Sequence, residues 1–416
     1  MNISRGWRMT CIWMMGLAFA GGSALHAQGL RISVSNPSPV SRLNEPIILR
    51  WADLIRQAPE VSPGTLGLVD EQQKPCVIQV DDLDLDGTPD EVTFAADFGP
   101  RQRRTFSLVT MEAVPAQKPK AATDAADWKR VKGVLQSLDD DNVAGNERIR
   151  GSYRFDGVGW ESEIAAYRLY LDERNAVDIL GKRIRGLYWQ QIGSTDMDYQ
   201  QDAHWGMDVL HVGAALGIGG IGFWSGDSVL KPITLDRQRT RIIARGPVRA
   251  LVRVAYSGWE VGNRKMDVTS LFSIYVGDRT CEQRVFVSNV VPGSILATGI
   301  VRHDSTTVLW NGKEGWLCTS GLQSRAGDSL LLALNVSPSD LVKKMEGRDD
   351  RLLLLKCHDS KPIRILISYY WQGETGRMWT QRQTKEYLNR IARRITEPLV
   401  VRVGRTRIHE SRPTKR

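Results

Sequence analysis

The densest group of chemically active side chains lies in the segment 198–208, DYQQDAHWGMD. His204 can accept or donate a proton near neutral pH, and Tyr199 can donate one. Trp205 offers a flat face to a sugar ring, and Asp208 can orient an imidazole or bind a hydroxyl group. A polar ligand site and a hydrogen-bonded structural loop can both have this composition, so the residues alone leave both interpretations open.

A second group occupies the segment 160–168, WESEIAAYR. In an extended strand, Glu161 and Tyr167 share one face, whereas Arg168 points to the other. We expect Trp160, Glu161 and Tyr167 to contact a sugar, and Arg168 to grip a carboxylate through two N–H groups. The alternative is that these side chains belong to a surface strand and bind no ligand.

Smaller groups lie further along the chain. Arg302 and His303 follow the apolar stretch ATGIV and add a cation and an imidazole. Trp371 belongs to the segment 369–379, YYWQGETGRMW, which suits stacking on carbohydrate and equally suits a packed loop. We predict that Arg302, His303 and Trp371 bind substrate. His211 stands between two apolar residues, so we expect it to pack in the interior.

The acidic segment 82–91, DLDLDGTPDE, has the spacing of a calcium-binding loop. Loop positions 1, 3, 5 and 9 hold hard oxygen ligands, and a glycine stands at the sharp turn. The four predicted metal ligands are Asp82, Asp84, Asp86 and Asp90. Position 12 is a threonine and strands flank the loop, so it is not an EF-hand. We predict a structural Ca²⁺ here, with a solvated acidic turn as the alternative, and expect no cofactor for chemistry.

Short strand-like stretches must position these groups. From Leu30 to Glu112 they recur every 8–12 residues between Gly, Pro and Asp turns, which is typical of a β-sandwich. A second, larger alternating region ends in an amphipathic helix over 380–395, and a short helix is expected over 128–138. The sequence thus predicts an all-β, mostly antiparallel protein with a small N-terminal β-sandwich, a large β-sandwich or supersandwich and a C-terminal helix. The predicted boundaries are a signal peptide 1–27, the N-terminal sandwich 28–114, a linker 115–148, the large domain 149–401 and a basic tail 402–416.

Composition excludes several classes of protein. The 416 residues are 42% hydrophobic and 25% charged, which is ordinary for a globular chain, and the formal charge is +9. No apolar run of 18 residues follows the N-terminus, so a polytopic membrane protein is excluded. The glycine run 213–222 lacks the βαβ context of a nucleotide loop, and no zincin, P-loop or nucleophile-elbow motif occurs. We expect no nucleic-acid partner.

The N-terminus has the layout of a secretory signal peptide. Two arginines precede an apolar stretch from Met9 to Ala20, and small residues follow. We predict cleavage after Ala27 and a periplasmic or secreted protein, with an N-terminal membrane anchor as the alternative. Four cysteines lie after this segment, and they can form two disulfides or remain free and buried.

Taken in order, the motifs WESEIAAYR, DYQQDAHWGMDVLHVGAALGIGGIGFW, GPVRA, ATGIVRH and ISYYW resemble those of one family. It is an exported bacterial family catalogued as domain of unknown function number four-eight-six-one, and the resemblance covers about residues 30–401. It implies a context of polysaccharide breakdown, often of uronate-containing chains, and a large domain like the β-supersandwich of sugar mutarotases. The family's signatures fall on Trp160, Glu161, Tyr167, Arg168, His204, Gly206 and Asp208. Gln200 replaces a histidine that members often carry, which puts a second histidine's role there in doubt.

The leading hypothesis is an enzyme that acts on uronate-containing oligosaccharides by elimination, as a lyase or dehydratase. Such chemistry needs a base, a partner for the carboxylate and an acid for the leaving oxygen. His204 would be the base, Arg168 the carboxylate partner, and Tyr167 or Tyr199 the acid. One alternative is a glycoside hydrolase that uses a carboxylate pair, Glu161 and Asp208. The other is a non-catalytic carbohydrate-binding protein.

Overall fold

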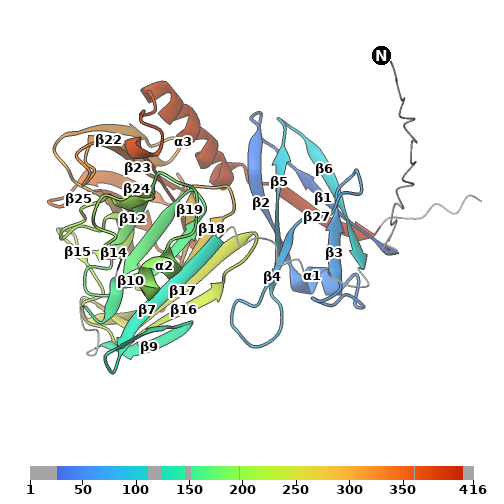
Figure 1. The fold of residues 1–416 in the computed structure, drawn as a ribbon, viewed down its shortest axis with the longest axis horizontal. Coiled ribbons are helices and arrows are strands. Elements are labelled where there is room, and N and C mark those ends of the chain that lie inside the picture. The colour runs from blue at the N-terminus through green and yellow to red at the C-terminus, as the bar shows by residue number, and fades with distance from the viewer. Residues whose placement is uncertain (1–25, 111–122, 146–150, 196, 360, 406–416) are drawn as a thin grey trace, which may run out of the picture.

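A computed structural model describes residues 26–110, 123–145, 151–195, 197–359 and 361–405. Its first region is a sandwich of two antiparallel sheets, with strand orders β27-β1-β6-β3 and β2-β5-β4 (Figure 1). The elements of this region are β1 (His26–Ser35), β2 (Arg42–Arg50), α1 (Trp51–Ile55), β3 (Leu66–Val69), β4 (Ile78–Asp81), β5 (Glu91–Phe98), β6 (Arg103–Thr110) and β27 (Val400–Arg405).

Alternation along these strands sends every second side chain into the space between the sheets. Ile47 and Leu49 of β2 are buried in this way, beside the Phe94 and Phe106 rings, whose centroids lie 4.8 Å apart in an edge-to-face contact. This core is separate from the core of the rest of the chain. The predicted N-terminal sandwich is therefore present.

The second region is built from three antiparallel sheets around one large apolar core. A six-stranded sheet (β13-β12-β11-β10-β7-β8) is linked to a five-stranded sheet (β15-β14-β20-β25-β24) by a bridge between Val177 and Gly217. The six-stranded sheet contains β7 (Thr123–Val131), β8 (Val134–Ser137), β10 (Tyr153–Ser162), β11 (Ala166–Tyr170), β12 (Val177–Lys182) and β13 (Gly206–Asp208). The five-stranded sheet contains β14 (Ile218–Trp224), β15 (Val229–Leu230), β20 (Ile295–Val301), β24 (Leu341–Glu346) and β25 (Asp350–Lys356).

The nine-stranded sheet has the order β21-β22-β23-β26-β19-β18-β17-β16-β9. Its strands are β9 (Asp140–Ala144), β16 (Arg237–Ala244), β17 (Arg249–Val261), β18 (Arg264–Tyr275), β19 (Cys281–Ser288), β21 (Thr306–Asn311), β22 (Trp316–Leu322), β23 (Ser329–Val336) and β26 (Ile363–Trp371). Two short helices, α2 (Trp189–Ser194) and η2 (Gln372–Glu374), lie in connections of this region. The predicted all-β, mostly antiparallel class is confirmed.

The predicted C-terminal helix is also confirmed, as α3 (Gln381–Thr396). Its N-cap is Thr380, whose hydroxyl accepts the backbone N–H of Gln383, while the Gln383 side chain accepts the Thr380 N–H. Leu388 and Ile391 lie on its buried face. Figure 1 shows α3 running along the large region toward its junction with the sandwich.

The structure differs from the predicted linker and tail. Residues 123–144 of the expected linker form β7, β8 and β9, and the expected helix over 128–138 is a β-hairpin. Lys132 and Gly133 have positive φ angles of 49° and 82°, which suits a tight hairpin turn. Residues 402–405, expected in the tail, belong to β27, where half-buried Val401 and Val403 pack against the sandwich core. The calls for residues 1–25, 115–122 and 406–416 lie outside the described residues.

Buried ion pairs join the two regions. Arg249 of β17 is fully buried and donates to Asp81 at 2.8 Å and to Glu91 at 2.8 Å, the pair that faces each other where the loop of the β4–β5 hairpin begins and ends. Arg394 of α3 bonds Glu45 of β2 at 3.1 Å. A buried guanidinium held by two carboxylates fixes one domain against the other, because loss of these contacts would leave buried charges without partners.

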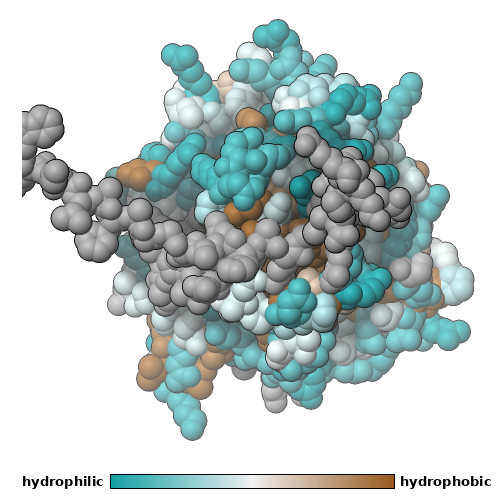
Figure 2. All heavy atoms as spheres, turned by 90° about the vertical axis from the view of Figure 1, so that its right-hand side faces the viewer, coloured by the Kyte–Doolittle hydropathy of each residue, from teal (hydrophilic) through white to brown (hydrophobic). Residues whose placement is uncertain are grey.

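Figure 2 views the molecule from the side of the N-terminal sandwich. Hydrophilic residues cover most of the described surface there, and hydrophobic residues show near the centre and at the lower edge. Among the described helices, none is long and apolar enough to cross a lipid bilayer.

Candidate functional site

Adjacent strands of the six-stranded sheet bring the two main predicted segments together. Trp160 of β10 pairs with Tyr167 of β11, which pairs with Ile179 of β12. The neighbouring β12 residue, Leu180, pairs with Asp208 of β13. The segments 160–168 and 198–208 therefore meet on one sheet, which the sequence could not establish.

Arg168 is the centre of a buried polar network on the outer face of this sheet. Its guanidinium donates to the hydroxyl of Tyr199 at 2.9 Å, to the hydroxyl of Tyr170 at 2.6 Å and to Asp208 at 3.1 Å. It also pairs with Asp178, which is fully buried. Burial and the nearby Asp178 charge raise the pKa of Asp208 to about 7, although Arg168 opposes the shift. Arg168 and Tyr199 are thus already occupied inside the protein.

Glu161 lies on the same face as Arg168, not on the opposite face as expected for one continuous strand, because the segment turns between Ser162 and Ala166 and Glu161 pairs with Ala166. Both oxygens of its carboxylate accept hydrogen bonds or pair with a cation. One of its oxygens accepts the backbone N–H groups of Tyr188 at 2.6 Å and Trp189 at 2.7 Å, and the other pairs with Lys182. Burial raises the pKa of Glu161 and lowers that of Lys182, while their mutual attraction opposes both shifts. The carboxylate anchors the start of α2, and no oxygen of it faces solvent.

The four predicted aromatic contacts are all buried. The Tyr167 hydroxyl donates to the carbonyls of Arg279 at 2.5 Å and Ile367 at 3.1 Å. Trp160 stacks on Phe272, with ring centroids 4.4 Å apart. Trp205 stacks on Tyr188 at 4.7 Å, and the Trp371 indole N–H donates to Asp328 at 2.7 Å. In this structure none of Trp160, Tyr167, Trp205 and Trp371 is more than 3% exposed, so none offers a ring face to a sugar.

His204 lies at the tip of a tight turn, where Ala203 and Gly206 form an isolated bridge. Its side chain is exposed. Beside it, Arg183 donates to the Ala203 carbonyl at 2.7 Å and pairs with Asp202. His204 is therefore available to a ligand, but it is separate from the buried Arg168 network that was expected to complete its site.

Arg302 and His303 border a cavity of about 480 Å³ at one end of the five-stranded sheet. It forms because β14 begins, β20 ends and β25 begins at the same edge. We call it the histidine pocket; its lining is His211, Val212, Gly213, Ala214, Ala215, Val301, Arg302, His303, Asp304, Arg348 and Asp349. It combines two imidazoles with two guanidinium groups and two carboxylates.

The expectation that His211 packs in the interior is wrong. Its neighbours Leu210 and Val212 are buried, whereas His211 is exposed and lines the pocket. The apolar–His–apolar order is the alternation of an extended segment, so the sequence did carry a sign of this placement. His303 lies against it: burial and the nearby His211 lower the pKa of His303, although a backbone hydrogen bond to His211 opposes the shift.

Two groups fix the wall of the histidine pocket. Lys231 donates to the carbonyls of Ala214 at 2.7 Å and Ala215 at 3.0 Å, and Asp350 accepts the Leu216 N–H at 2.8 Å. Gly217 follows with φ of +70°, and a Cβ there would lie 2.0 Å from the Val177 carbonyl oxygen. The glycine run therefore serves a close turn between strands. Lys231, Arg348 and Asp349 were not predicted, because nothing in their local sequence marks them.

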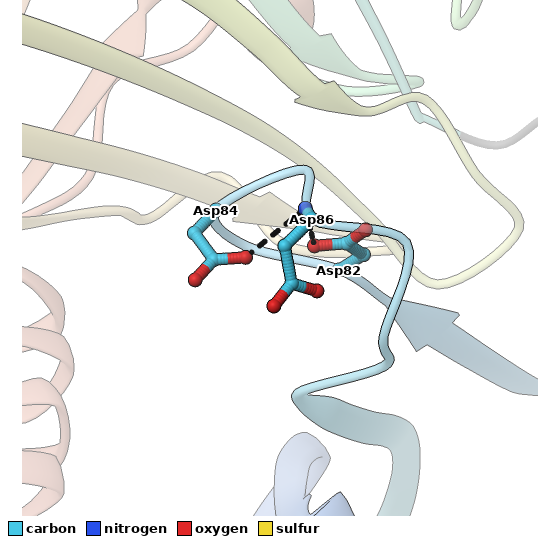
Figure 3. A group of neighbouring side chains, drawn as sticks. All are labelled: Asp82, Asp84 and Asp86. Atoms are coloured by element: carbon cyan, nitrogen blue, oxygen red, sulfur yellow. Dashed lines mark hydrogen bonds between the residues drawn. The ribbon is translucent and has the colours of Figure 1, made fainter.

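The acidic loop joins β4 to β5 at the junction of the two domains (Figure 3). Oxygen atoms of Asp82, Asp84 and Asp86 lie within 4.8 Å of one another. Asp82 accepts N–H groups from Leu85 at 2.7 Å and from Asp86 at 3.2 Å, which organises the turn. The fourth predicted ligand, Asp90, instead accepts the Leu83 N–H at 2.7 Å. Three of the four carboxylates thus converge in a way that suits a hard cation.

Cys76, Cys281, Cys318 and Cys357 are all free in the structure. Cys281 is buried and accepts the Trp160 indole N–H at 3.1 Å. Of the two alternatives for the cysteines, the structure has free thiols. Burial raises the pKa of Cys281 and Cys318, so these two are unreactive core residues.

Fold and pocket together define a two-domain, all-β protein with a polar pocket at the end of one sheet. The family described as "Domain of unknown function (DUF4861)" matches residues 34–401, and the chain belongs to this family. The resemblance in the motif order is thereby confirmed.

One curated protein is similar to the chain in sequence, and two solved structures are similar to it in fold. "Uncharacterized protein P7" of Formosa agariphila is 21% identical over 354 residues, which are 77% of this chain and 80% of that protein. Two solved structures from Enterococcus faecalis, a protein in glycosyl hydrolase family 38 and an α-mannosidase, each match with 8% identity and a TM-score of 0.46. They cover 91% of this chain, which spans about half of their length, 48% and 46%.

Proposed function

We propose that this protein is a carbohydrate-active enzyme that acts on uronate-containing oligosaccharides by elimination in the histidine pocket. The observation that carries the proposal is the meeting of His211, His303, Arg302 and Arg348 around one cavity of about 480 Å³. A pocket of this size suits a sugar unit, and guanidinium groups bind carboxylates through two parallel N–H donors. The polysaccharide context implied by the family resemblance points the same way.

The pocket holds the groups that elimination needs. His211 is exposed in it and takes the proton from the carbon next to the sugar carboxylate. The electron pair forms a carbon–carbon double bond, and the bond to the oxygen on the next carbon breaks. The protonated His211 returns its proton to that leaving oxygen. Arg302 and Arg348 balance the carboxylate charge that grows as the proton leaves.

This assignment moves the base from His204 to His211. The partners expected for His204 are buried: Arg168 is 2% exposed, Tyr167 is in the core, and Tyr199 bonds Arg168. His303 takes a positioning role, because its ring lies against the His211 backbone and its Nε2 is buried with no hydrogen-bond partner among the residues that the structure describes. His204 remains an exposed ligand contact.

The decisive experiment incubates the protein with a panel of uronate oligosaccharides and follows the products by mass spectrometry. Loss of one water indicates a dehydratase, and fragments carrying a new double bond indicate a lyase. His211→Ala should abolish product formation, whereas His204→Ala should retain it. Full turnover by His211→Ala would overturn the assignment of the base.

Two other outcomes correspond to the alternative functions. Fragments without a double bond would indicate hydrolysis, for which Asp304 and Asp349 of the pocket are the accessible carboxylates, since Glu161 and Asp208 are buried. Binding without any product would indicate a carbohydrate-binding protein.

We also propose export to the periplasm or the exterior, on the strength of the N-terminal pattern. Cleavage after Ala27 would remove His26 and Ala27, which pair with Thr110 and Val109 at the start of β1. The rest of β1, from Arg31 to Ser35, keeps its pairing with β6. The N-terminal residue of protein recovered from the periplasm or medium tests the site of cleavage.

A further inference from the structure

A second basic group lies beside the segment that leads to the histidine pocket. The turn between β22 and β23 crosses the segment that leads to His211: Leu210 forms a bridge with Ser324, and the Arg325 N–H donates to the Val209 carbonyl at 2.9 Å. Arg325 is therefore held beside the backbone two residues before His211. A ligand longer than one sugar unit that occupies the pocket can extend over this turn.

Arg325 is only partly neutralised. Its side chain is 32% exposed, and Nη1 lies 3.3 Å from Asp208 Oδ2. Asp208 is buried and also bonds Arg168 at 3.1 Å, and its other oxygen, Oδ1, has no hydrogen-bond partner among the described residues. Because Asp208 keeps Arg168 as a partner, Arg325 can turn toward a ligand without leaving the buried carboxylate unpaired.

Arg183 supplies a second cation on the same side. Its side chain is 30% exposed, and its partner Asp202 is 63% exposed, so a ligand carboxylate can replace this solvated pair at little cost. The guanidinium lies over the Trp371 ring, 4.7 Å from its centroid. The Trp371 indole N–H donates to Asp328 in the same turn as Arg325, at 2.7 Å. Trp371 thus connects the two arginines.

We infer that Arg183, His204 and Arg325, here called the arginine rim, form a second subsite that binds another carboxylate-bearing sugar unit of the same chain. The inference rests on the proposed function, since it extends the ligand from the histidine pocket. It makes the enzyme selective for acidic chains of several units. A sulfate ester on the sugar presents the same anionic chemistry and is distinguished by the test.

Calorimetric titration of the His211→Ala protein, in which the ligand is not consumed, tests the subsite. The probes are galacturonate and glucuronate as single units and as hexamers, the same hexamers with their carboxylates reduced to alcohols, and a sulfated neutral hexamer. We expect the acidic hexamer to bind at least about tenfold more tightly than the single unit, as one additional ion pair would provide. Preference for the sulfated hexamer over the uronates would assign the rim to sulfate esters.

Substitution of the rim provides the matched comparison. Adding Arg183→Gln and Arg325→Gln to the His211→Ala protein should remove the roughly tenfold preference for length while leaving the affinity for the single sugar unit unchanged. Arg325→Lys, which keeps the charge, should retain part of the preference for the longer ligand. If the double variant is unfolded by circular dichroism, Arg183→Gln alone should remove part of the preference, since Asp202 is its only paired carboxylate among the described residues.

The outcomes separate the two proposals. An unchanged length preference in the folded variants would overturn the rim subsite and leave the proposed function intact. An equal loss for reduced and acidic hexamers would also overturn it, because the rim would then not recognise charge. Failure of every acidic probe to bind the histidine pocket, with no product from wild-type protein, would instead refute the proposed function.

Discussion

Replacement of Arg168 by methionine is the sharpest test of the buried network. The change leaves Asp178, 0% exposed, and Asp208, 1% exposed, without their shared cation. Breaking a buried ion pair from one side costs about 3–5 kcal/mol, since an uncompensated charge remains in the interior. Asp178 loses its cation here and Asp208 keeps only the partly exposed Arg325 at 3.3 Å, while protonation of Asp208 relieves part of the cost, so we expect a loss of about 4 kcal/mol in the free energy of unfolding.

The assay is urea unfolding followed by tryptophan fluorescence. Trp189 and Trp205 pack on the same face as Arg168 and report on it directly. Arg302→Met is the control: its side chain is 44% exposed, and we expect a change within about 0.5 kcal/mol. Adding Asp178→Asn to Arg168→Met should recover part of the loss, because fewer buried charges remain unpaired. A loss below about 1 kcal/mol for Arg168→Met would refute the reasoning that the network is a buried, mutually dependent set of charges.

Three further predictions concern Asp208, the acidic loop and Gly217. Because the pKa of Asp208 is raised to about 7, the folded protein holds a proton there that the unfolded chain releases near pH 4; this contribution to stability falls as pH rises from about 4 to about 7, and Asp208→Asn should flatten that part of the profile of unfolding midpoints against pH. Millimolar Ca²⁺ should raise the melting temperature of chelator-treated protein, and Asp82→Asn with Asp86→Asn should remove the rise; equal melting temperatures with and without Ca²⁺ would favour the solvated acidic turn. Gly217→Ala should lower stability by about 2 kcal/mol or more in calorimetry, since its Cβ would lie 2.0 Å from the Val177 carbonyl oxygen, whereas Gly226→Ala, with open space around it, isolates the backbone cost of a positive φ.

Much of the fold follows from local alternation. Stretches such as β2 and β19 carry the period of two that sends one face inward, and α3 carries its capping box and apolar stripe in plain sequence. The hairpin β7–β8 was harder, because its strands are partly exposed and only the Lys132–Gly133 turn marks it. β27 escaped prediction because its partner, β1, lies at the other end of the chain.

The site was less accessible to sequence reasoning, for a physical reason. Arg302 and His303 were singled out, but their companions Arg348 and Asp349 come from a turn that only the pairing of β20 with β25 places beside them. Conversely, the most conspicuous motif residues, such as Arg168 and Glu161, are of types common in catalysis. Their hydrogen-bonding groups are nevertheless bound to other groups of the protein. Residue type shows what a side chain can do, whereas long-range pairing decides whether it is free to do so.

The proposed function explains why Arg168 and its carboxylate partners are buried in the protein. An apolar face of equal volume would be as stable as an ion-pair network or more so, so stability alone does not explain Arg168 and its partners. The network instead fixes Tyr199 and Asp208, at either end of the turn that carries His204. From Asp208 the chain runs through Val209, the acceptor of the Arg325 N–H, to His211 at the pocket. A single segment thus has an inward side held by buried charges and an outward side that presents groups to solvent. On this argument a substitution in the network that leaves the protein folded should still weaken the binding of acidic ligands, because the outward groups lose the support that fixes their positions.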